Sequence, residues 1–156
     1  MKKALYIFLQ CTWGFFQTAL GFAVFLVNIR ANHYFYHGAV ITEWKNSTSV
    51  SLGLFVFVTK EPYFYDKVRH ACPTREDAFR RLRVHEYGHT IQSLFLGPLY
   101  LPVIGIPSSV WCFLPPLVNM RRNDGVSYFA FYTEKGANYW GEKVTGEKSM
   151  EQLVID

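Results

Sequence analysis

The sequence predicts an α+β fold in which an N-terminal apolar helix precedes a β-hairpin and two helices that carry a metal site. Three observations support it: an uncharged apolar run at residues 4–29, two β-rich stretches at residues 34–44 and 49–59, and a His-Glu-x-x-His motif in a helical stretch. The 156 residues, half of them hydrophobic, suffice to bury a core. We expect residues 1–30 to form a membrane-associated helix and residues 31–156 to form one domain.

The apolar run has Lys2 and Lys3 before it and Arg30 after it. Its length exceeds the roughly 20 residues that cross a bilayer. Its polar members, which include Gln10 and Gln17, also suit a helix that lies in the membrane interface. A transmembrane helix, and a helix that lies in the interface or docks on the core, both remain open, and membrane lipid is the expected partner.

Charge and cysteine content narrow the classes of partner. The formal net charge is +4, but no basic cluster is interleaved with aromatic residues, so we expect no nucleic acid partner. Acidic lipid headgroups suit the excess positive charge better. The three cysteines form no C-x-x-C pair, and we expect buried free thiols at Cys11, Cys72 and Cys112.

The β-rich stretches at residues 34–44 and 49–59 are separated by the turn-like residues 45–48. Two such runs joined by a short turn are typical of an antiparallel hairpin. We therefore expect each stretch to form one strand and the two strands to pair with each other.

A helix is expected to follow, with Thr74 as its N-cap, Asp77 in its first turn and Gly97 at its end. Residues 94–120 lack charge but contain prolines at 98, 102, 107, 115 and 116. Because each proline removes a backbone donor, we expect a buried or membrane-dipping loop there. A further helix is expected from about residue 126, and a polar, peripheral tail from residue 144.

The residues with catalytic potential lie in the His-Glu-x-x-His motif. On a helix, His85 and His89 lie four residues apart on one face, so that both imidazoles can bind one ion. Glu86 lies about 100° around the helix, within reach of a water on that ion. Zn²⁺ lowers the pKa of such a water towards about 7, and a carboxylate beside it can serve as general base. The spacing therefore predicts a zinc site with Glu86 as its catalytic residue.

A catalytic zinc requires a third protein ligand, and Glu134 is the favoured candidate. It lies in the next helical segment, and Asn138 follows one turn later, where it can orient a ligand histidine. Tyr128 and Tyr132 are candidate donors to a developing oxyanion, although core packing explains them as well.

The paired motifs HEYGH and TEKGAN resemble the gluzincin class of zinc metallopeptidases, whose second helix carries Glu-x-x-x-Asp. Residues 85–141 are similar to a group of small bacterial proteins regarded as membrane-associated peptidases. The resemblance implies His85, His89 and Glu134 as metal ligands, Glu86 as general base, Zn²⁺ as cofactor and a peptide or protein as substrate. It also implies a location at the bacterial cell membrane. Asn138 departs from the pattern, because an amide lacks the charge by which aspartate raises ligand basicity.

Two alternatives remain. In one, Asp124 of the Asn-Asp-Gly turn is the third ligand, which resembles the intramembrane site-2 peptidases, although the polar flanks fit poorly with a site in lipid. In the other, the chain is a non-catalytic membrane protein in which a structural metal joins two helices as a scaffold or partner-binding module. Only the peptidase needs Glu86.

Overall fold

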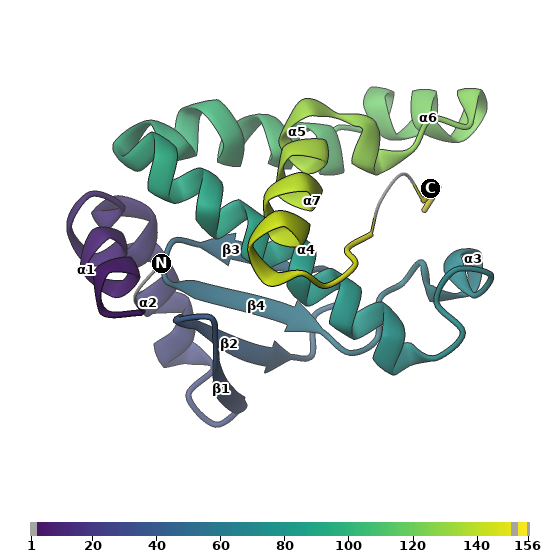
Figure 1. Cartoon of the computed structure of the whole chain (residues 1–156). Helices are drawn as coiled ribbons and strands as arrows, with labels where there is room; N and C mark the ends of the chain where they lie inside the picture. Colours follow the sequence, from purple (N-terminus) through teal and green to yellow (C-terminus); the bar gives the residue numbers. More distant parts are fainter. Residues whose placement is uncertain (1–2, 151–152, 156) are drawn as a thin grey trace.

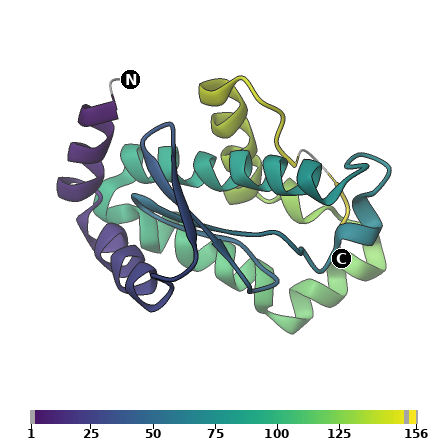
Figure 2. The same ribbon diagram turned by 90° about the horizontal axis from the view of Figure 1, so that it is seen from below.

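The computed structural model describes residues 3–150 and 153–155. In this part of the chain, seven α-helices and a four-stranded mixed sheet form an α+β architecture, as the sequence predicts (Figure 1). The long helix α4 (Arg75–Leu96) packs on the sheet with one side and on α7 (Tyr132–Thr145) with another. Figure 2 shows the sheet lying against α4.

The sheet has the order β1-β2-β4-β3, with bounds Asn32–Tyr36, Ala39–Trp44, Phe55–Thr59 and Val50–Leu52 in that order. The expected hairpin between residues 34–44 and 49–59 is therefore wrong. Each stretch is itself an antiparallel hairpin, and the central strands β2 and β4 pair in parallel. The chain reverses where the backbone adopts positive φ at His37, Gly38 and Gly53, conformations that glycine adopts without steric cost.

The N-terminal apolar run forms two helices, α1 (Lys3–Thr12) and α2 (Phe15–Val27), bent by 97° at their junction. The expected single helix is thus broken, at Gly14. A Cβ there would lie 2.7 Å from Gln10 Oε1, so glycine permits the close packing at the bend. Among the described residues, no single helix has both the length and the apolar character of a membrane span. Two bent pairs satisfy these criteria jointly, namely α1 with α2 and residues 101–113 with α6 (Pro115–Asp124).

Helix α4 follows the short α3 (Tyr65–Val68) and begins where the sequence predicts. Thr74 accepts a hydrogen bond from the Asp77 backbone, and the Asp77 side chain accepts one from the Thr74 backbone. This reciprocal cap satisfies two backbone donors at the helix start. At the other end Gly97 takes a positive φ of 53°.

The proline-rich segment is helical, so the expected loop is wrong. It comprises η1 (Gly97–Leu99), the π-helical turn η2 (Leu101–Gly105), α5 (Ile106–Phe113) and α6 (Pro115–Asp124). Its prolines lie in the first turns of these elements, where the backbone nitrogen needs no intrahelical partner. The prolines therefore start helices here and divide the segment into short pieces.

The C-terminal part differs from expectation in two respects. A 3₁₀ turn, η3 (Tyr128–Ala130), precedes α7, so that this helix begins at Tyr132. The tail is not peripheral, because Met150 and Ile155 are buried with the core. Glu147 secures the return of the chain by accepting hydrogen bonds from Tyr36 and Arg83. Residues 151, 152 and 156 of the tail lie outside the described part.

The three cysteines are free thiols, as expected. Cys72 is buried and Cys112 is half-buried, but Cys11 is exposed on α1. The expectation of burial fails at Cys11 because α1 turns several of its apolar side chains outward.

Candidate metal centre

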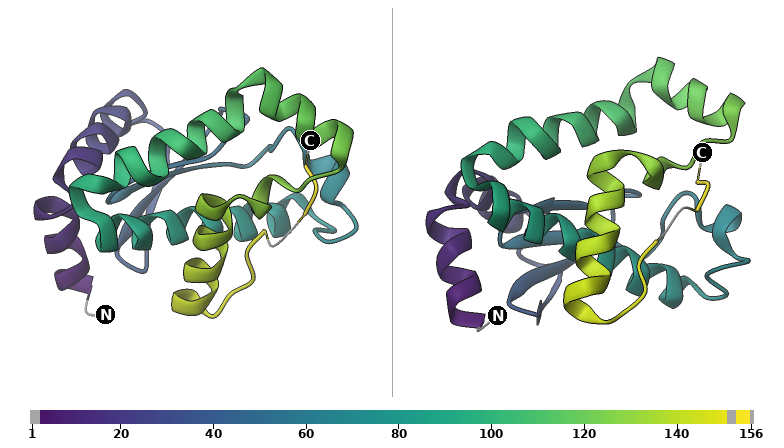
Figure 3. Two further views of the ribbon diagram at one scale, coloured as in Figure 1. Left: turned by 90° about the horizontal axis from the view of Figure 1, so that it is seen from above. Right: turned by 45° about the horizontal axis from the view of Figure 1, so that its top comes forward.

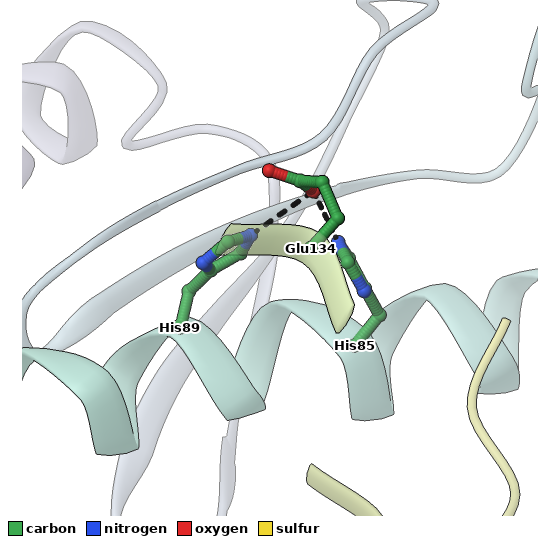
Figure 4. A group of neighbouring side chains, drawn as sticks. All are labelled: His85, His89 and Glu134. Carbon is green, nitrogen blue, oxygen red and sulfur yellow. Dashed lines mark hydrogen bonds and ion pairs between the residues drawn. The ribbon is translucent and has the colours of Figure 1, made fainter. Parts of the chain in front are cut away.

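The two histidines of the motif lie on one face of α4, as their spacing predicts (Figure 4). His85 is 2% exposed and His89 is 6% exposed. Their ring centroids are 5.0 Å apart, and the Nε2 atom of each ring points toward the same carboxylate. Burying an imidazole ring without a hydrogen-bond partner or a metal ion costs free energy, so each of these rings requires polar neighbours.

Glu134 supplies that carboxylate from the first turn of α7, where a negative charge is favoured by the helix dipole. Its Oε2 lies 3.1 Å from His85 Nε2 and 3.4 Å from His89 Nε2. Its other oxygen, Oε1, accepts a hydrogen bond of 2.8 Å from Thr133 Oγ1. The structure therefore brings together the three predicted ligands, and Glu134 is 1% exposed.

Glycines allow α4 and α7 to approach closely enough for this contact. A Cβ added to Gly88 would lie 1.8 Å from the carbonyl oxygen of Ala137, and a Cβ added to Gly141 would lie 2.2 Å from that of Val84. No side chain larger than hydrogen fits at either position without displacement of a helix. Gly88, the glycine within the motif, costs about 1 kcal/mol in helix propensity. The close crossing of α4 and α7 that it permits offsets this cost.

Two carboxamides fix the orientation of the imidazole rings. His85 Nδ1 lies 2.8 Å from Asn138 Oδ1, and His89 Nδ1 lies 2.7 Å from Gln92 Oε1. The amide nitrogen of Gln92 donates to the carbonyl of Thr133 at 2.8 Å, which leaves its oxygen for His89. Because each Nδ1–H donates to an amide oxygen, the lone pair of each neutral ring is on Nε2, facing Glu134.

The electrostatics of the metal-free triad couple His89 to Glu134. Burial lowers the pKa of His89, but the carboxylate of Glu134 outweighs burial and raises this pKa to about 9. Burial raises the pKa of Glu134, whereas His89 and His85 lower it, and the net result is a pKa well below the usual value. A cation is therefore favoured at this position, either a proton on His89 or a metal ion.

The donor set fits a divalent metal such as zinc. Two imidazole nitrogens and one carboxylate oxygen lie within 4.8 Å of one another. Ligand bonds of about 2 Å at tetrahedral angles separate neighbouring donor atoms by roughly 3.3 Å, close to the spacings between Glu134 Oε2 and the two histidine nitrogens. Three protein ligands of this kind are typical of catalytic zinc sites, which keep a fourth position for water or substrate.

Glu86 lies beside the triad, one residue after His85. Its Oε2 accepts a hydrogen bond of 2.6 Å from Ser51 Oγ, and the same hydroxyl lies 2.7 Å from the Glu86 carbonyl oxygen. Ser51 belongs to the edge strand β3, so the sheet holds this carboxylate in position. Burial raises the pKa of Glu86, although the two histidines oppose the rise. A raised pKa suits a carboxylate that takes up and returns a proton.

Two cavities adjoin Glu86. One of about 310 Å³ extends past His89 and Glu134 between β3 and α5, and one of about 50 Å³ extends past His85. Ser49, Glu86 and Tyr128 line both cavities, so the carboxylate and the phenol lie between them. Burial and the charge of Glu134 raise the pKa of Tyr128 well above its ordinary value, and its hydroxyl stays protonated.

Other predicted candidates lie elsewhere. The Tyr132 hydroxyl donates to the Val103 carbonyl, and this side chain is half-exposed and lines neither cavity. Asp124 is exposed at the C-terminal end of α6 and is not part of the buried triad. The structure thus groups Glu134, and not Asp124, with the histidines.

Sequence reasoning missed three neighbours of the site. Gln92 follows His89 by one helical turn, and this spacing alone makes a contact between them feasible. Ser51 lies 35 residues from Glu86 in the chain, and no local pattern announces their contact. Tyr100 lines the larger cavity and donates to the Ser51 carbonyl at 3.3 Å.

Neither protein-family models, nor curated proteins, nor solved structures gave a match to the chain. A chemical role for the triad must therefore be argued from its three side chains, their hydrogen-bond partners and the cavities around them.

Proposed function

We propose that the protein is a zinc-dependent peptidase in which His85, His89 and Glu134 hold the metal and Glu86 is the general base. The observation that carries this proposal is the place of Glu86, a buried carboxylate that borders the same cavity as His89 and Glu134. Zinc, when bound, supplies the Lewis acidity that activates water and polarises a peptide carbonyl. A metal with a purely structural role would not require a carboxylate at this position.

The side chains have separate roles in the reaction. Glu86 takes a proton from the attacking water as the bond between water oxygen and carbonyl carbon forms. It then gives that proton to the nitrogen of the leaving amine as the C–N bond breaks. Tyr128 retains its hydroxyl proton and lies between the cavities, where it is the candidate donor to the oxygen of the former carbonyl. Asn138 and Gln92 keep the ligand rings in their required tautomer.

A conservative substitution tests this proposal. Glu86→Gln keeps the shape of the side chain but removes its basicity, so zinc content should stay near that of the parent and peptide cleavage should fall by roughly 10²–10⁴-fold. Zinc is measured by elemental analysis, and cleavage by mass spectrometry of a mixed peptide library. Glu76→Gln, the same change at an exposed position of α4, is the control and should leave both unchanged. Full cleavage by Glu86→Gln, or a parent protein that binds no zinc, would rule the proposal out.

The second candidate function is a non-catalytic scaffold in which the metal joins α4 to α7. The near-complete burial of all three ligands favours it, because structural metals are commonly enclosed by protein. The same experiment separates the two functions. A scaffold binds zinc in the parent and in both variants, and none of the three proteins cleaves a peptide.

A further inference from the structure

The exposed large apolar side chains are concentrated on two segments of the chain. The first is the α1–α2 pair with the two residues that follow it, and the second runs from the end of α4 through η1, η2 and α5 into α6. We refer to these two sets together as the apolar face. Its members are Leu5, Phe8, Trp13, Phe15, Phe16, Leu20, Phe22, Leu26, Val27 and Ile29 on the first segment, and Phe95, Leu99, Val103, Ile106, Val110, Phe113, Leu114 and Met120 on the second.

The polar side chains of the first segment point the other way. Gln10 and Gln17 are fully buried, and Thr18 is 7% exposed. Gln10 donates to the Thr90 carbonyl of α4 at 2.9 Å, and Gln17 donates to Ser93 Oγ at 2.7 Å. These hydrogen bonds fix the rotation of both helices, so that their apolar sides face outward. This is the reverse of a helix pair in a water-soluble domain, which buries its apolar side.

The two segments meet at the junction of α1 and α2. A Cβ on Gly97 would lie 2.2 Å from the indole of Trp13, so the bend of the first segment packs directly on the start of the second. Both views in Figure 3 show α1 and α2 at the end of the molecule where the helices of residues 97–113 begin. The two segments therefore meet in space at this junction, although they lie far apart in sequence.

Charge indicates what covers this face. Residues 1–42 and 87–123 contain no acidic side chain. Exposed basic residues lie at the limits of the two segments, namely Lys3 at the start of α1, Arg30 after α2 and Arg122 on α6. Apart from the exposed Asp124 that ends α6, these margins are basic, and an apolar centre with basic margins is complementary to acyl chains and anionic headgroups.

We propose that the apolar face docks onto an anionic lipid bilayer, with α1 and α2 held along α4 and their outward side chains inserted into the headgroup region and the adjacent acyl chains. This docking does not depend on the catalytic role proposed above. It specifies that the membrane contact comprises both the N-terminal pair and the proline-rich helices.

One consequence concerns the substrate class and rests on the proposed function. Ile106 and Val110 of α5 belong to the apolar face, at 61% and 44% exposed, and also line the 310 Å³ cavity beside Glu86. The cavity thus borders the surface that contacts lipid. The substrate class that fits is a peptide segment held close to the membrane, such as the flank of a lipid-anchored or membrane-embedded chain.

Vesicle flotation tests the docking. The full chain, purified in mild detergent, is mixed with vesicles of phosphatidylcholine or of an equal mixture of phosphatidylcholine and phosphatidylglycerol. We expect binding to the mixed vesicles and several-fold weaker binding to the neutral ones. Phe15→Ser with Phe16→Ser, and separately Leu99→Ser with Val103→Ser, should each reduce binding roughly tenfold or more, because apolar area no longer leaves water. Phe35→Ser is the matched control, since Phe35 is 72% exposed on β1 and belongs to neither segment.

Equal binding by the parent and both double variants would overturn the proposal, and so would an equal loss in Phe35→Ser or equal binding to both kinds of vesicle. A parent that binds no vesicle and sediments as a dimer would assign the face to a second copy of the chain instead. Unfolding temperatures in detergent verify that each variant is folded.

A second measurement needs no destabilising variant. Trp13, half-exposed at the bend, should lose fluorescence when the vesicles contain brominated acyl chains, and the Trp13→Phe protein should lose less. Equal quenching of both proteins would contradict insertion of the bend.

The substrate class is tested by comparing one cleavable peptide with and without an acyl anchor, in the presence of vesicles. The anchored form should be cleaved roughly tenfold faster by the parent but not by the Phe15→Ser, Phe16→Ser protein, and the free peptide should be cleaved equally by both. Equal cleavage of both forms by the parent would refute the substrate class alone. If no peptide is cleaved at all while vesicle binding persists, the proposed catalytic function fails and the docking stands.

Discussion

At the scale of single residues, the site is distinguished by the groups that orient its histidines. Both Nδ1 atoms face carboxamide oxygens, Asn138 for His85 and Gln92 for His89. An amide fixes the tautomer as a carboxylate does, but contributes no charge to the ring it holds. Among the described residues, the carboxylate bonded to both rings is that of Glu134, which lies on the Nε2 side. The affinity of the site for zinc should therefore depend strongly on what occupies position 138.

Two substitutions at Asn138 separate orientation from charge. Asn138→Asp keeps the acceptor and adds a negative charge, so zinc should bind roughly tenfold more tightly than in the parent. Asn138→Leu removes the acceptor at similar volume and should weaken zinc binding by about 10–100-fold. Competition titrations with a chromophoric chelator measure both affinities. Unchanged affinity in Asn138→Leu would show that the hydrogen bond does not position His85.

At the scale of secondary structure, the crossing of α4 and α7 places Glu134 beside the two histidines. His85 and His89 are brought together by the helix period, but Glu134 reaches them only because Gly88 faces Ala137 and Gly141 faces Val84. The ligand set is thus a property of the helix pair and not of either helix alone.

Gly88→Ala tests this crossing. The added methyl group would clash with the Ala137 carbonyl, so we expect a loss of about 3 kcal/mol in the free energy of unfolding together with weaker zinc binding. Gly105→Ala is the control, because this helical glycine has no atom closer than 3.4 Å to the added carbon, and its effect should stay within about 1 kcal/mol. Chemical denaturation gives both values. Similar stabilities of the two variants would contradict the proposed role of Gly88.

At the scale of the whole molecule, the charge coupling in the triad links metal binding to global stability. The folded-state pKa of His89, about 9, lies above its ordinary value of 6.5, so folding of the metal-free protein favours the protonated ring. This stabilisation is complete below about pH 6.5 and is lost as the pH rises through about 9. Zinc must displace that proton, so the extra stability of the zinc-bound protein over the metal-free protein increases with pH.

Thermal unfolding with zinc and with a chelator should reveal this link. The difference in unfolding free energy between the two conditions should widen between about pH 6.5 and pH 9, by at most about 1.4 kcal/mol per pH unit for one proton. In the chelated protein, His89→Asn has no titrating group at that position and should not lose stability between about pH 6.5 and pH 9 as the chelated parent does. Parallel pH profiles of the zinc-loaded and chelated parent would contradict the coupling.

Local patterns in the sequence sufficed to predict several features of the fold and of the site. The α+β class, both ends of α4 and the common face of His85 and His89 follow from capping residues, helix period and strand or helix propensity. These features depend on residues within one or two helical turns of each other, and their physical causes act over that range. The uncharged N-terminal run was equally visible, although the bend that divides it was not.

Tertiary structure alone decided the rest. The parallel pairing of β2 with β4 replaced the expected hairpin, since strand partners are chosen by burial across the sheet and not by the nearest turn. The prolines between residues 98 and 116 were expected to exclude helices, but they start helices because they lie in first turns. Ser51 bonds to Glu86, and Gln92 bonds to Thr133, only because distant segments of the chain pack together. The burial of Met150 in the tail has the same cause. Such contacts depend on the packing of the folded chain, which no short stretch of sequence specifies by itself.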